Sequence, residues 1–391
     1  MGGIGVATNT ISGFSTINFI NPAAMAGIRL TTIDVAVFGS NLKLTRNFQG
    51  SNSNNNFRLN HLAFAIPVSK KSALSFGLLP YSQVGYNYKQ SQDNFGTGEL
   101  ADSSAVNFSY SGEGGLTKAY LGYGFTIGNN LLLGANVSYI FGNLKNYRTT
   151  SIPSLYGTFD TRVEQSSSIQ GLNYDFGAQY IINLSDANKL TFGYSGSANT
   201  KLNVQNSDFV SHFTSDGLGN ENIPVDSVIK NVGAKSKLQL PLINRFGVSY
   251  RMGDKLLLAA DYSTGKWSDL TIAGTNAGLK DSRTVNFGAQ FTPNINKLGN
   301  YWALVDYRAG FIYNETYLHV NNYGIKQYAA TFGLGLPLRP GPSNTSFYKI
   351  NVSAEVGTRG ALRNNLVKEN YINIRLGFTL NDKWFQRYKF D

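Results

Sequence analysis

The chain has 391 residues, of which 34 are lysine or arginine and 23 are aspartate or glutamate, so its formal net charge is +11. Only 15% of the residues are charged, against about 25% in an average soluble domain, while 13% are aromatic and an ordinary 42% are hydrophobic. The absence of cysteine excludes a disulfide scaffold, a thiolate metal site and a cysteine nucleophile. The three histidines leave little for histidine-based chemistry. The length accommodates two or three soluble domains or one large barrel.

The first 30 residues form an apolar segment without regular alternation. It is too apolar for a free tail and too irregular for a strand, so we predict that residues 1–30 fill the inside of the fold as a plug. Its large side chains either line a pocket or pack the plug; the candidates are Phe14, Phe19, Ile20 and Met25. The start lacks the basic and apolar regions of a secretory signal, which indicates a cytosolic protein or a mature chain whose signal peptide is absent. The strands that follow favour the second.

From residue 31 onward, apolar and polar residues alternate with a period of two, which predicts strands that separate two environments. The run from Val285 to Phe291 is an example. No apolar run approaches the roughly 20 residues that a membrane-spanning helix needs. The alternation predicts fourteen strands, many longer than ten residues, over 31–47, 57–68, 72–89, 104–127, 130–147, 166–182, 188–203, 236–251, 255–271, 282–293, 301–318, 325–337, 346–360 and 370–380.

The connections between these strands alternate in length. The short set comprises residues 69–71, 128–129, 184–187 and 252–254, and the long, polar set comprises 90–103, 148–165 and 204–235. Short turns at one rim and long loops at the other are typical of outer-membrane barrels. We therefore predict an all-β fold, a 14-stranded antiparallel transmembrane β-barrel over residues 31–380, with 204–235 as its long extracellular loop. The barrel closes only if 104–127 is one interrupted strand. A soluble β-sandwich, whose strands are shorter, is the less favoured alternative.

Charged residues within the predicted strands fall mostly on the face that points into the barrel. The short turn pairs residue 251 with residue 255, a sum of 506 that Arg245 and Asp261 also satisfy. We predict an ion pair between these two residues in the lumen. Glu355 and Arg375 belong to adjacent strands, and Arg375 also neighbours the first strand with Asp34, so we expect a polar network at the seam. The alternative is that each charge is separately solvated in a wet lumen.

Two neighbouring strands contain residues that interrupt regular pairing. Pro80 lies in the middle of the third strand, and proline cannot donate to the ladder. The fourth strand contains Gly112, Gly114 and Gly115, a density of glycine that a regular strand tolerates poorly. Counted from the short-turn rim, the two sites lie at comparable heights, so we predict either a gap in the wall or an ordinary bulge. Unbroken pairing between the third and fourth strands would exclude the gap.

The opening of the chain resembles a known family. A glycine-rich start, the run FINPAAMAGI and then directly the first strand look like the FadL family of outer-membrane transporters for long-chain fatty acids and aromatic hydrocarbons. The family's hatch motif is matched by Asn21, Pro22 and Ala23. The strand count matches over the whole chain, whereas the motif covers residues 1–30 only. The resemblance implies an N-terminal hatch inside the barrel and a kinked wall through which hydrophobic substrates leave sideways into the membrane.

Three further stretches resemble FadL-like members from the Bacteroidota, namely residues 77–88, 108–125 and 372–391. The last departs from the common barrel ending, because basic and aromatic residues follow the final strand. We expect residues 381–391 to form a periplasmic C-terminal tail, which is either a solvated end or a docking element for a partner.

The leading hypothesis is a passive channel in the outer membrane of a Gram-negative cell that takes up small hydrophobic molecules. The alternative is a non-transporting barrel subunit of a large outer-membrane machine, such as a type 9 secretion or barrel-assembly complex, in which 204–235 and 381–391 contact protein partners. A water-filled porin is opposed by the apolar plug.

An enzyme is not expected. A catalytic barrel needs a His-carboxylate or Ser-His arrangement, and the sequence indicates no partner set near His61 or His212. We expect no cofactor and no metal. The basic residues are dispersed, which does not indicate a nucleic-acid partner; membrane lipid and the phosphates of lipopolysaccharide are the expected partners of a basic outer-membrane protein.

Overall fold

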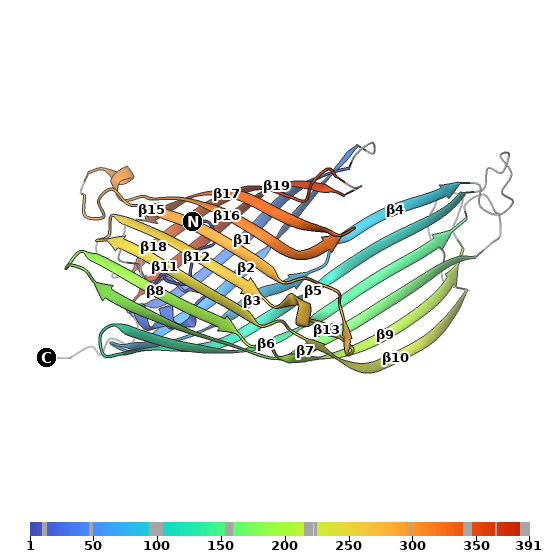
Figure 1. Ribbon diagram of the computed structural model, residues 1–391, viewed down its shortest axis with the longest axis horizontal. Helices are drawn as coiled ribbons and strands as arrows, with labels where there is room; N and C mark the ends of the chain where they lie inside the picture. Colours follow the sequence, from blue (N-terminus) through green and yellow to red (C-terminus); the bar gives the residue numbers. More distant parts are fainter. Residues whose placement is uncertain are drawn as a thin grey trace.

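The computed structural model describes residues 1–9, 14–46, 50–93, 105–152, 159–214, 222, 225–297, 299–338, 346–363 and 366–383. They form an all-β, closed antiparallel barrel (Figure 1). One sheet contains all its strand segments: β1 (Thr31–Thr45), β2 (Ser51–Ser69), β3 (Ser72–Gln83), β4 (Tyr86–Asp93), β5 (Ala105–Ile127), β6 (Leu131–Ser151), β7 (Asp160–Asn183), β8 (Asn188–Ser197), β9 (Lys201–Phe213), β10 (Asp226–Gln239), β11 (Ile243–Met252), β12 (Leu256–Gly265), β13 (Thr271–Ile272), β14 (Thr275–Asn276), β15 (Ser282–Phe291), β16 (Asp306–Val320), β17 (Tyr323–Leu338), β18 (Phe347–Arg359) and β19 (Lys368–Asp382). Three 3-10 helices complete the described elements: η1 (Pro22–Gly27), η2 (Trp267–Asp269) and η3 (Tyr301–Ala303).

Fourteen strands build the wall, as the sequence predicts. The number of segments is larger because some wall strands are interrupted, as where β3 continues into β4 and β8 into β9. β5, which the predicted count requires as one element, is continuous from Ala105 to Ile127. The last strand, β19, pairs with β1 from Thr31 opposite Asp382 to Thr45 opposite Lys368, and this pairing closes the barrel.

The prediction of a long loop over residues 204–235 is wrong. β9 and β10 occupy most of this range and pair from His212 opposite Asp226 down to Lys201 opposite Gln239. In Figure 1, β4, β5, β6, β7, β9 and β10 extend well beyond the ends of the other strands. Where both faces of a strand meet water, the apolar row that signals a transmembrane strand is missing. β2 likewise begins at Ser51, before the predicted start at residue 57. Its Asn-rich first residues lack the apolar row and were therefore missed.

The predicted C-terminal tail begins inside a strand, because β19 continues to Asp382. Residues 384–391 of that tail lie outside the described residues.

The outer face of the wall is apolar and the inner face largely polar. On β6, Val137 and Tyr139 are 48% and 42% exposed, whereas Ser138 between them is 1% exposed. The exposed apolar row continues round the barrel through Phe176, Phe192, Phe246, Leu258, Phe287, Phe311, Phe332 and Leu376. This pattern inverts that of a soluble protein and is the one expected of a closed wall in hydrocarbon. None of the helices in the described part of the chain has the length and hydrophobicity that crossing a bilayer demands.

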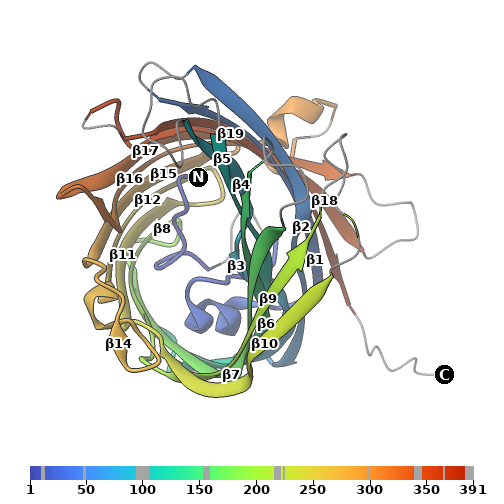
Figure 2. The same ribbon diagram turned by 90° about the vertical axis from the view of Figure 1, so that its right-hand side faces the viewer.

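The N-terminal segment, residues 1–9 and 14–30, lies inside the ring of strands (Figure 2). Its helix η1 contacts β3, β5, β6 and β7. Met25 and Ile28 of this segment are fully buried in a cluster with alanines of β2 and β3 and with Tyr120 of β5. The segment is therefore packed against the inner wall, and the small residues opposite it are what let it approach.

The connection between β12 and β15 is held by one carboxylate. Asp281 accepts hydrogen bonds from the Ser268 hydroxyl at 2.7 Å, the Ser268 backbone N–H at 3.2 Å and the Lys266 ammonium at 2.9 Å. The hydrogen bond from the Ser268 side chain, followed by that from Lys266, lowers the pKa of Asp281 to about 2. The Trp267 ring in the same connection stacks on Tyr317 with ring centroids 4.1 Å apart.

We expect the order of this connection to depend on pH in the acid range. Folding lowers the pKa of Asp281 from 3.8 to about 2, so its hydrogen bonds stabilise the connection fully above pH 4 and are lost as the pH falls through about 2. Tryptophan fluorescence between pH 5 and about pH 1 measures the change in a Trp302→Phe/Trp384→Phe background, in which Trp267 is the one tryptophan. In Asp281→Asn this acid transition should be absent; the same transition in both proteins would contradict the role of Asp281.

Candidate functional site

Asn21 fastens the N-terminal segment to itself and to the wall. Its side-chain oxygen accepts a hydrogen bond from the Ala23 N–H at 3.0 Å and so begins η1, with Pro22 at the first helical turn. Its side-chain amide donates to the Val6 carbonyl at 2.6 Å and to the Tyr194 carbonyl of β8 at 3.2 Å. Asn21 is 0% exposed. The Asn-Pro-Ala sequence therefore joins two parts of the segment at a strand of the barrel.

Asp261 holds the start of the chain, and it does so without Arg245. Its carboxylate accepts hydrogen bonds from the backbone N–H groups of Gly5 at 2.6 Å and Val6 at 2.9 Å. The predicted Arg245–Asp261 ion pair is wrong, because Arg245 lies opposite Ser263 and Gly247 lies opposite Asp261. The β11–β12 turn pairs Met252 with Leu256, so paired numbers sum to 252 + 256 = 508 rather than 506. A shift of two residues keeps both side chains on the inward face but separates them along the strands.

At the seam, two separate sets of contacts form. Arg375 donates to the Glu355 carboxylate at 3.1 Å and lies over the Phe38 ring at 5.3 Å. Asp34 instead accepts from the Thr379 hydroxyl at 3.3 Å and lies 3.3 Å from Nε2 of His61. Glu355 and Arg375 are thus in contact, as the order of the strands predicts. Asp34 does not join them but lies beside Thr379 and His61. The sequence did not indicate this neighbour for His61.

All four candidate pocket residues serve to pack the N-terminal segment, either against the barrel wall or against itself. Phe14 contacts Phe347 edge-on at 6.2 Å, and the Lys349 ammonium lies 3.6 Å from the centre of its ring. Phe19 lies between His61 and Tyr120. Met25 is fully buried, and Ile20 lies against Gly5. None of the four lines either of the two lumen cavities described below.

A belt of inward-facing glycines makes room for the segment. A methyl group added at Gly134 would clash with Pro22, and one added at Gly193 would clash with Val6. Several members face one another across neighbouring strands, as Gly134 does with Gly124 and with Gly177. The belt consists of the glycines whose added Cβ would lie closer than 3.0 Å to the N-terminal segment: Gly124, Gly134, Gly177, Gly193, Gly247, Gly288 and Gly310.

The wall is not open between the third and fourth strands. β3 pairs with β5 from Ser72 to Gln83 with one bulge after Pro80, the Val84 N–H donates to the Gly114 carbonyl at 3.0 Å, and β4 continues the pairing from Tyr86. β5 passes through Gly112, Gly114 and Gly115 without a break, and Gly114 takes a φ of 107° there. The predicted gap between these two strands is therefore wrong.

The interruption lies on the other edge of β3. β2 and β3 pair only up to Leu62 opposite Leu78, although β2 continues to Ser51. Over the described residues beyond that point, β2 pairs with β1 alone and β3 with β5 alone. The bulge after Pro80 turns β3 away from β2 at this height, because proline cannot supply the next donor to a ladder. The Arg58 guanidinium of β2 donates to the Gln83 side chain of β3 across the separation.

A cavity of about 460 Å³ lies on the inner side of this separation. Pro80 and Tyr81 line it from β3, and Phe38 and Tyr371 contribute aromatic surface from β1 and β19. The remaining lining is mostly polar or charged: Ser40, Asn54, Asn56, Arg58, Ser82, Gln83, Arg359, Glu369 and Asn373. The cavity therefore borders the place where the wall loses its pairing.

The sequence of the whole chain matches the model of one protein family. The model described as BamG matches residues 1–391, the whole chain. The chain belongs to the BamG family. No curated protein matches its sequence.

Solved structures give this BamG-family barrel a FadL-type fold. The CymD monoaromatic hydrocarbon channel matches with a TM-score of 0.60 at 15% identity, over 98% of this chain and 96% of that one. The Pseudomonas putida toluene transporter TodX matches with a TM-score of 0.55 at 13% identity, over 97% and 96%. A Pseudomonas aeruginosa FadL homologue matches with a TM-score of 0.54 at 15% identity, over 94% and 93%. The resemblance to FadL-like outer-membrane transporters, predicted from the sequence, is confirmed in the fold.

Sequence reasoning missed the most buried ionic cluster of this BamG-family chain. Asp306, which is 0% exposed, accepts from the Lys349 ammonium at 2.8 Å, the Arg308 guanidinium at 2.9 Å and the Thr292 hydroxyl at 2.8 Å. Arg308 also donates to Gln290 at 2.8 Å. The cluster reaches the N-terminal segment, because Lys349 contacts Phe14. Its signal in the sequence is a pair of charges two residues apart on β16, Asp306 and Arg308, and one charge on β18, Lys349, with β17 between the two strands.

Proposed function

We propose that this BamG-family chain is a passive outer-membrane channel that takes up small hydrophobic molecules, with residues 1–30 as its hatch and a lateral exit between β2 and β3. One observation carries the proposal: the wall loses its β2–β3 pairing beyond Leu62 and Leu78 while the N-terminal segment lies inside the barrel. A solute that cannot pass the segment has this side route. The solved CymD and TodX structures, described as a hydrocarbon channel and a toluene transporter, support the substrate class.

The proposed route follows the apolar parts of the inner wall. An apolar cluster on β5, β6, β7 and β9 and directly after β10 lies on the inner side: Leu116, Ile140, Ile169, Leu202, Val204 and Leu240. From there a solute reaches the cavity beside Pro80, and separation of the Arg58–Gln83 contact admits it to the bilayer. Transfer from a partly polar cavity into hydrocarbon is favourable for an apolar solute, so no energy source is required.

Uptake by intact cells tests this function. A deletion strain should take up a labelled monoaromatic hydrocarbon or a long-chain fatty acid more slowly than wild type, and the plasmid-borne gene should restore the rate. Equal uptake by the deletion strain and the wild type would contradict transport of that solute class.

A glycine of the belt tests whether residues 1–30 act as a hatch. We expect Gly134→Ala to displace η1, because the added methyl group would meet the Pro22 backbone. In an Ala24→Cys background, thiol labelling reports the displacement, since the chain has no other cysteine and Ala24 is 1% exposed. Gly39→Ala is the control, as its added Cβ would lie 3.9 Å from the ring of Phe57, an ordinary van der Waals contact. Equally slow labelling in both variants would count against a close-fitting hatch.

The polarity of the cavity at the separation of β2 and β3 favours a second function. Arg58, Arg359 and Glu369 are poor surroundings for an apolar solute, and the unpaired edges of β2 and β4 offer backbone groups to another chain. The chain would then be a non-transporting barrel subunit of a larger outer-membrane machine. Purification from native membranes separates the two functions: a stoichiometric partner that survives purification supports the subunit, and a lone barrel supports the channel.

A further inference from the structure

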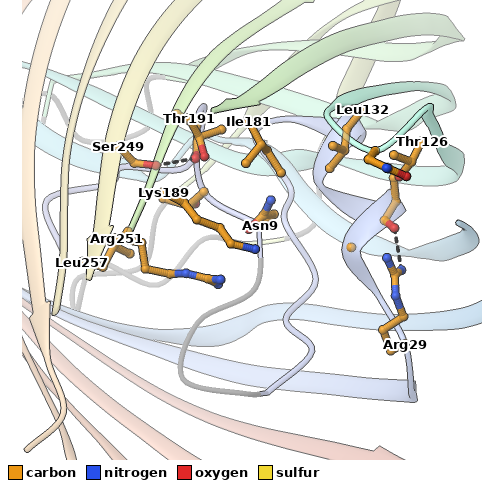
Figure 3. Close-up of a pocket in the computed structure, with 15 residues that line it drawn as sticks. Asn9, Arg29, Thr126, Leu132, Ile181, Lys189, Thr191, Ser249, Arg251 and Leu257 are labelled. Atoms are coloured by element: carbon orange, nitrogen blue, oxygen red, sulfur yellow. Dashed lines mark hydrogen bonds between the residues drawn. The ribbon is translucent and has the colours of Figure 1, made fainter. Parts of the chain in front are cut away.

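A second cavity lies at the end of the barrel that carries the short turns. Its volume is about 290 Å³, and it lies between the N-terminal segment and the inner wall of β5, β6, β7, β8, β11 and β12. Figure 3 shows its lining. The segment contributes Thr8, Asn9 and Arg29, and the wall contributes Lys189 of β8 and Arg251 of β11.

The charge of this cavity is of one sign. Of the described residues, Arg29, Lys189 and Arg251 line it, and no carboxylate does. Lys189 and Arg251 lie directly opposite each other on β8 and β11, and in Figure 3 both side chains extend into the same space beside Asn9. Like charges directly opposite on neighbouring strands repel and destabilise a sheet. Within the described part of the chain, neither Arg29 nor Lys189 has a carboxylate at ion-pair distance.

One of the three cations, Arg29, is held in a fixed direction. The Arg29 guanidinium donates to the Ala26 carbonyl at 2.6 Å and the Ile28 carbonyl at 3.0 Å, which fixes its direction at the rim of the cavity. One row further along the strands, Ser249 lies opposite Thr191 and donates to the Ala7 carbonyl at 2.7 Å. The segment and the wall thus meet at the cavity. Leu132, Ile181 and Leu257 add an apolar side.

We propose that this cavity binds a phosphate monoester. Such a group carries a charge of about −1.5 to −2 near neutral pH and presents three strong acceptor oxygens, which matches the two opposed cations and a third on the facing segment. Arginine binds phosphate through two parallel hydrogen bonds, and lysine binds it as a point charge. Leu132 and Ile181 accommodate a small apolar body attached to the phosphate. This site is independent of the proposed lateral exit.

Isothermal titration calorimetry of the full chain in detergent tests the site, with inorganic phosphate and butyl phosphate as separate probes at constant ionic strength. We expect saturable binding of one phosphate per chain and weaker binding of acetate. Lys189→Gln and Arg29→Gln should each weaken phosphate binding by about tenfold or more, because each removes a charge-assisted hydrogen bond. Lys189→Arg retains the charge and should bind. Tighter binding of butyl phosphate than of inorganic phosphate would support the apolar side as part of the site.

The control removes a charge at the same end of the barrel but outside the cavity. Lys70→Gln lies in the short turn between β2 and β3 and should bind phosphate as wild type does. Heat-modifiable migration of each variant on a gel verifies that its barrel is folded. Absence of saturable phosphate binding by the wild type, unchanged binding by Lys189→Gln, or equal weakening by Lys70→Gln would each overturn the proposal.

Discussion

Joining β2 to β3 across their separation is expected to reduce hydrophobic uptake to the level of a deletion strain. The double variant Arg58→Cys/Gln83→Cys places thiols at the two residues whose side chains meet across the gap. The chain has no native cysteine, so a short bis-maleimide reacts only there. If solutes leave sideways at this height, a covalent bridge between the strands blocks the exit while leaving the barrel and the N-terminal segment in place. Uptake of a labelled hydrocarbon by cells, before and after cross-linking, measures the effect.

The matched control bridges the same two strands where they are already paired. Leu62 and Leu78 form the last register pair before the separation. Leu62→Cys/Leu78→Cys therefore carries the same cross-link but leaves the proposed exit open. Uptake should survive in this control. If cross-linking lowers uptake equally in both double variants, or in neither, the exit does not lie between β2 and β3.

Asp306→Ala is expected to lower the free energy of unfolding by about 3–5 kcal/mol, the cost of removing one partner of a buried ion pair. Within the described residues, Asp306 is the one carboxylate that contacts both Lys349 and Arg308. Its removal leaves these two buried cations without their shared counter-ion. Lys349 is 3% exposed and also contacts Phe14, so the N-terminal segment should loosen as well. Urea unfolding in detergent, followed by heat-modifiable migration, measures the loss.

Two comparison variants separate the buried cluster from a general effect of charge. Asp254→Ala removes an exposed carboxylate from the β11–β12 turn and should change stability by no more than about 0.5 kcal/mol. Adding Lys349→Met to Asp306→Ala should recover part of the loss, because it removes one of the uncompensated cations. If Asp254→Ala lowered the free energy of unfolding as much as Asp306→Ala does, the buried cluster would contribute no more to stability than an exposed carboxylate.

Errors in predicting the strands have one common cause. Alternation located the wall strands where one face meets lipid, as from Val285 to Phe291, because the contrast between hydrocarbon and lumen is strong there. It failed over 204–235 and at residues 51–56, where β9, β10 and β2 continue beyond the apolar band. A strand that is wet on both faces has no reason to alternate, so its composition resembles that of a loop.

Errors in the predicted contacts have a different cause. Parity along a strand put Arg245 and Asp261 on the inward face, but their pairing depended on the length of one turn, and an error of two residues in the register removed it. Pro80 marked the height at which pairing fails. It did not indicate which edge of β3 loses its neighbour, because that depends on the positions of β2 and β5 in three dimensions.

The sequence by itself determined the class of the fold, the strand count and the internal position expected for residues 1–30, because each follows from local composition and period. Only the tertiary structure decided what those parts touch. Asp261 binds the backbone of Gly5 and Val6 instead of Arg245, seven glycines from different strands form one belt, and Lys189 meets Arg251 at a cavity. These contacts join residues far apart in the chain, and barrel closure and strand register bring them together.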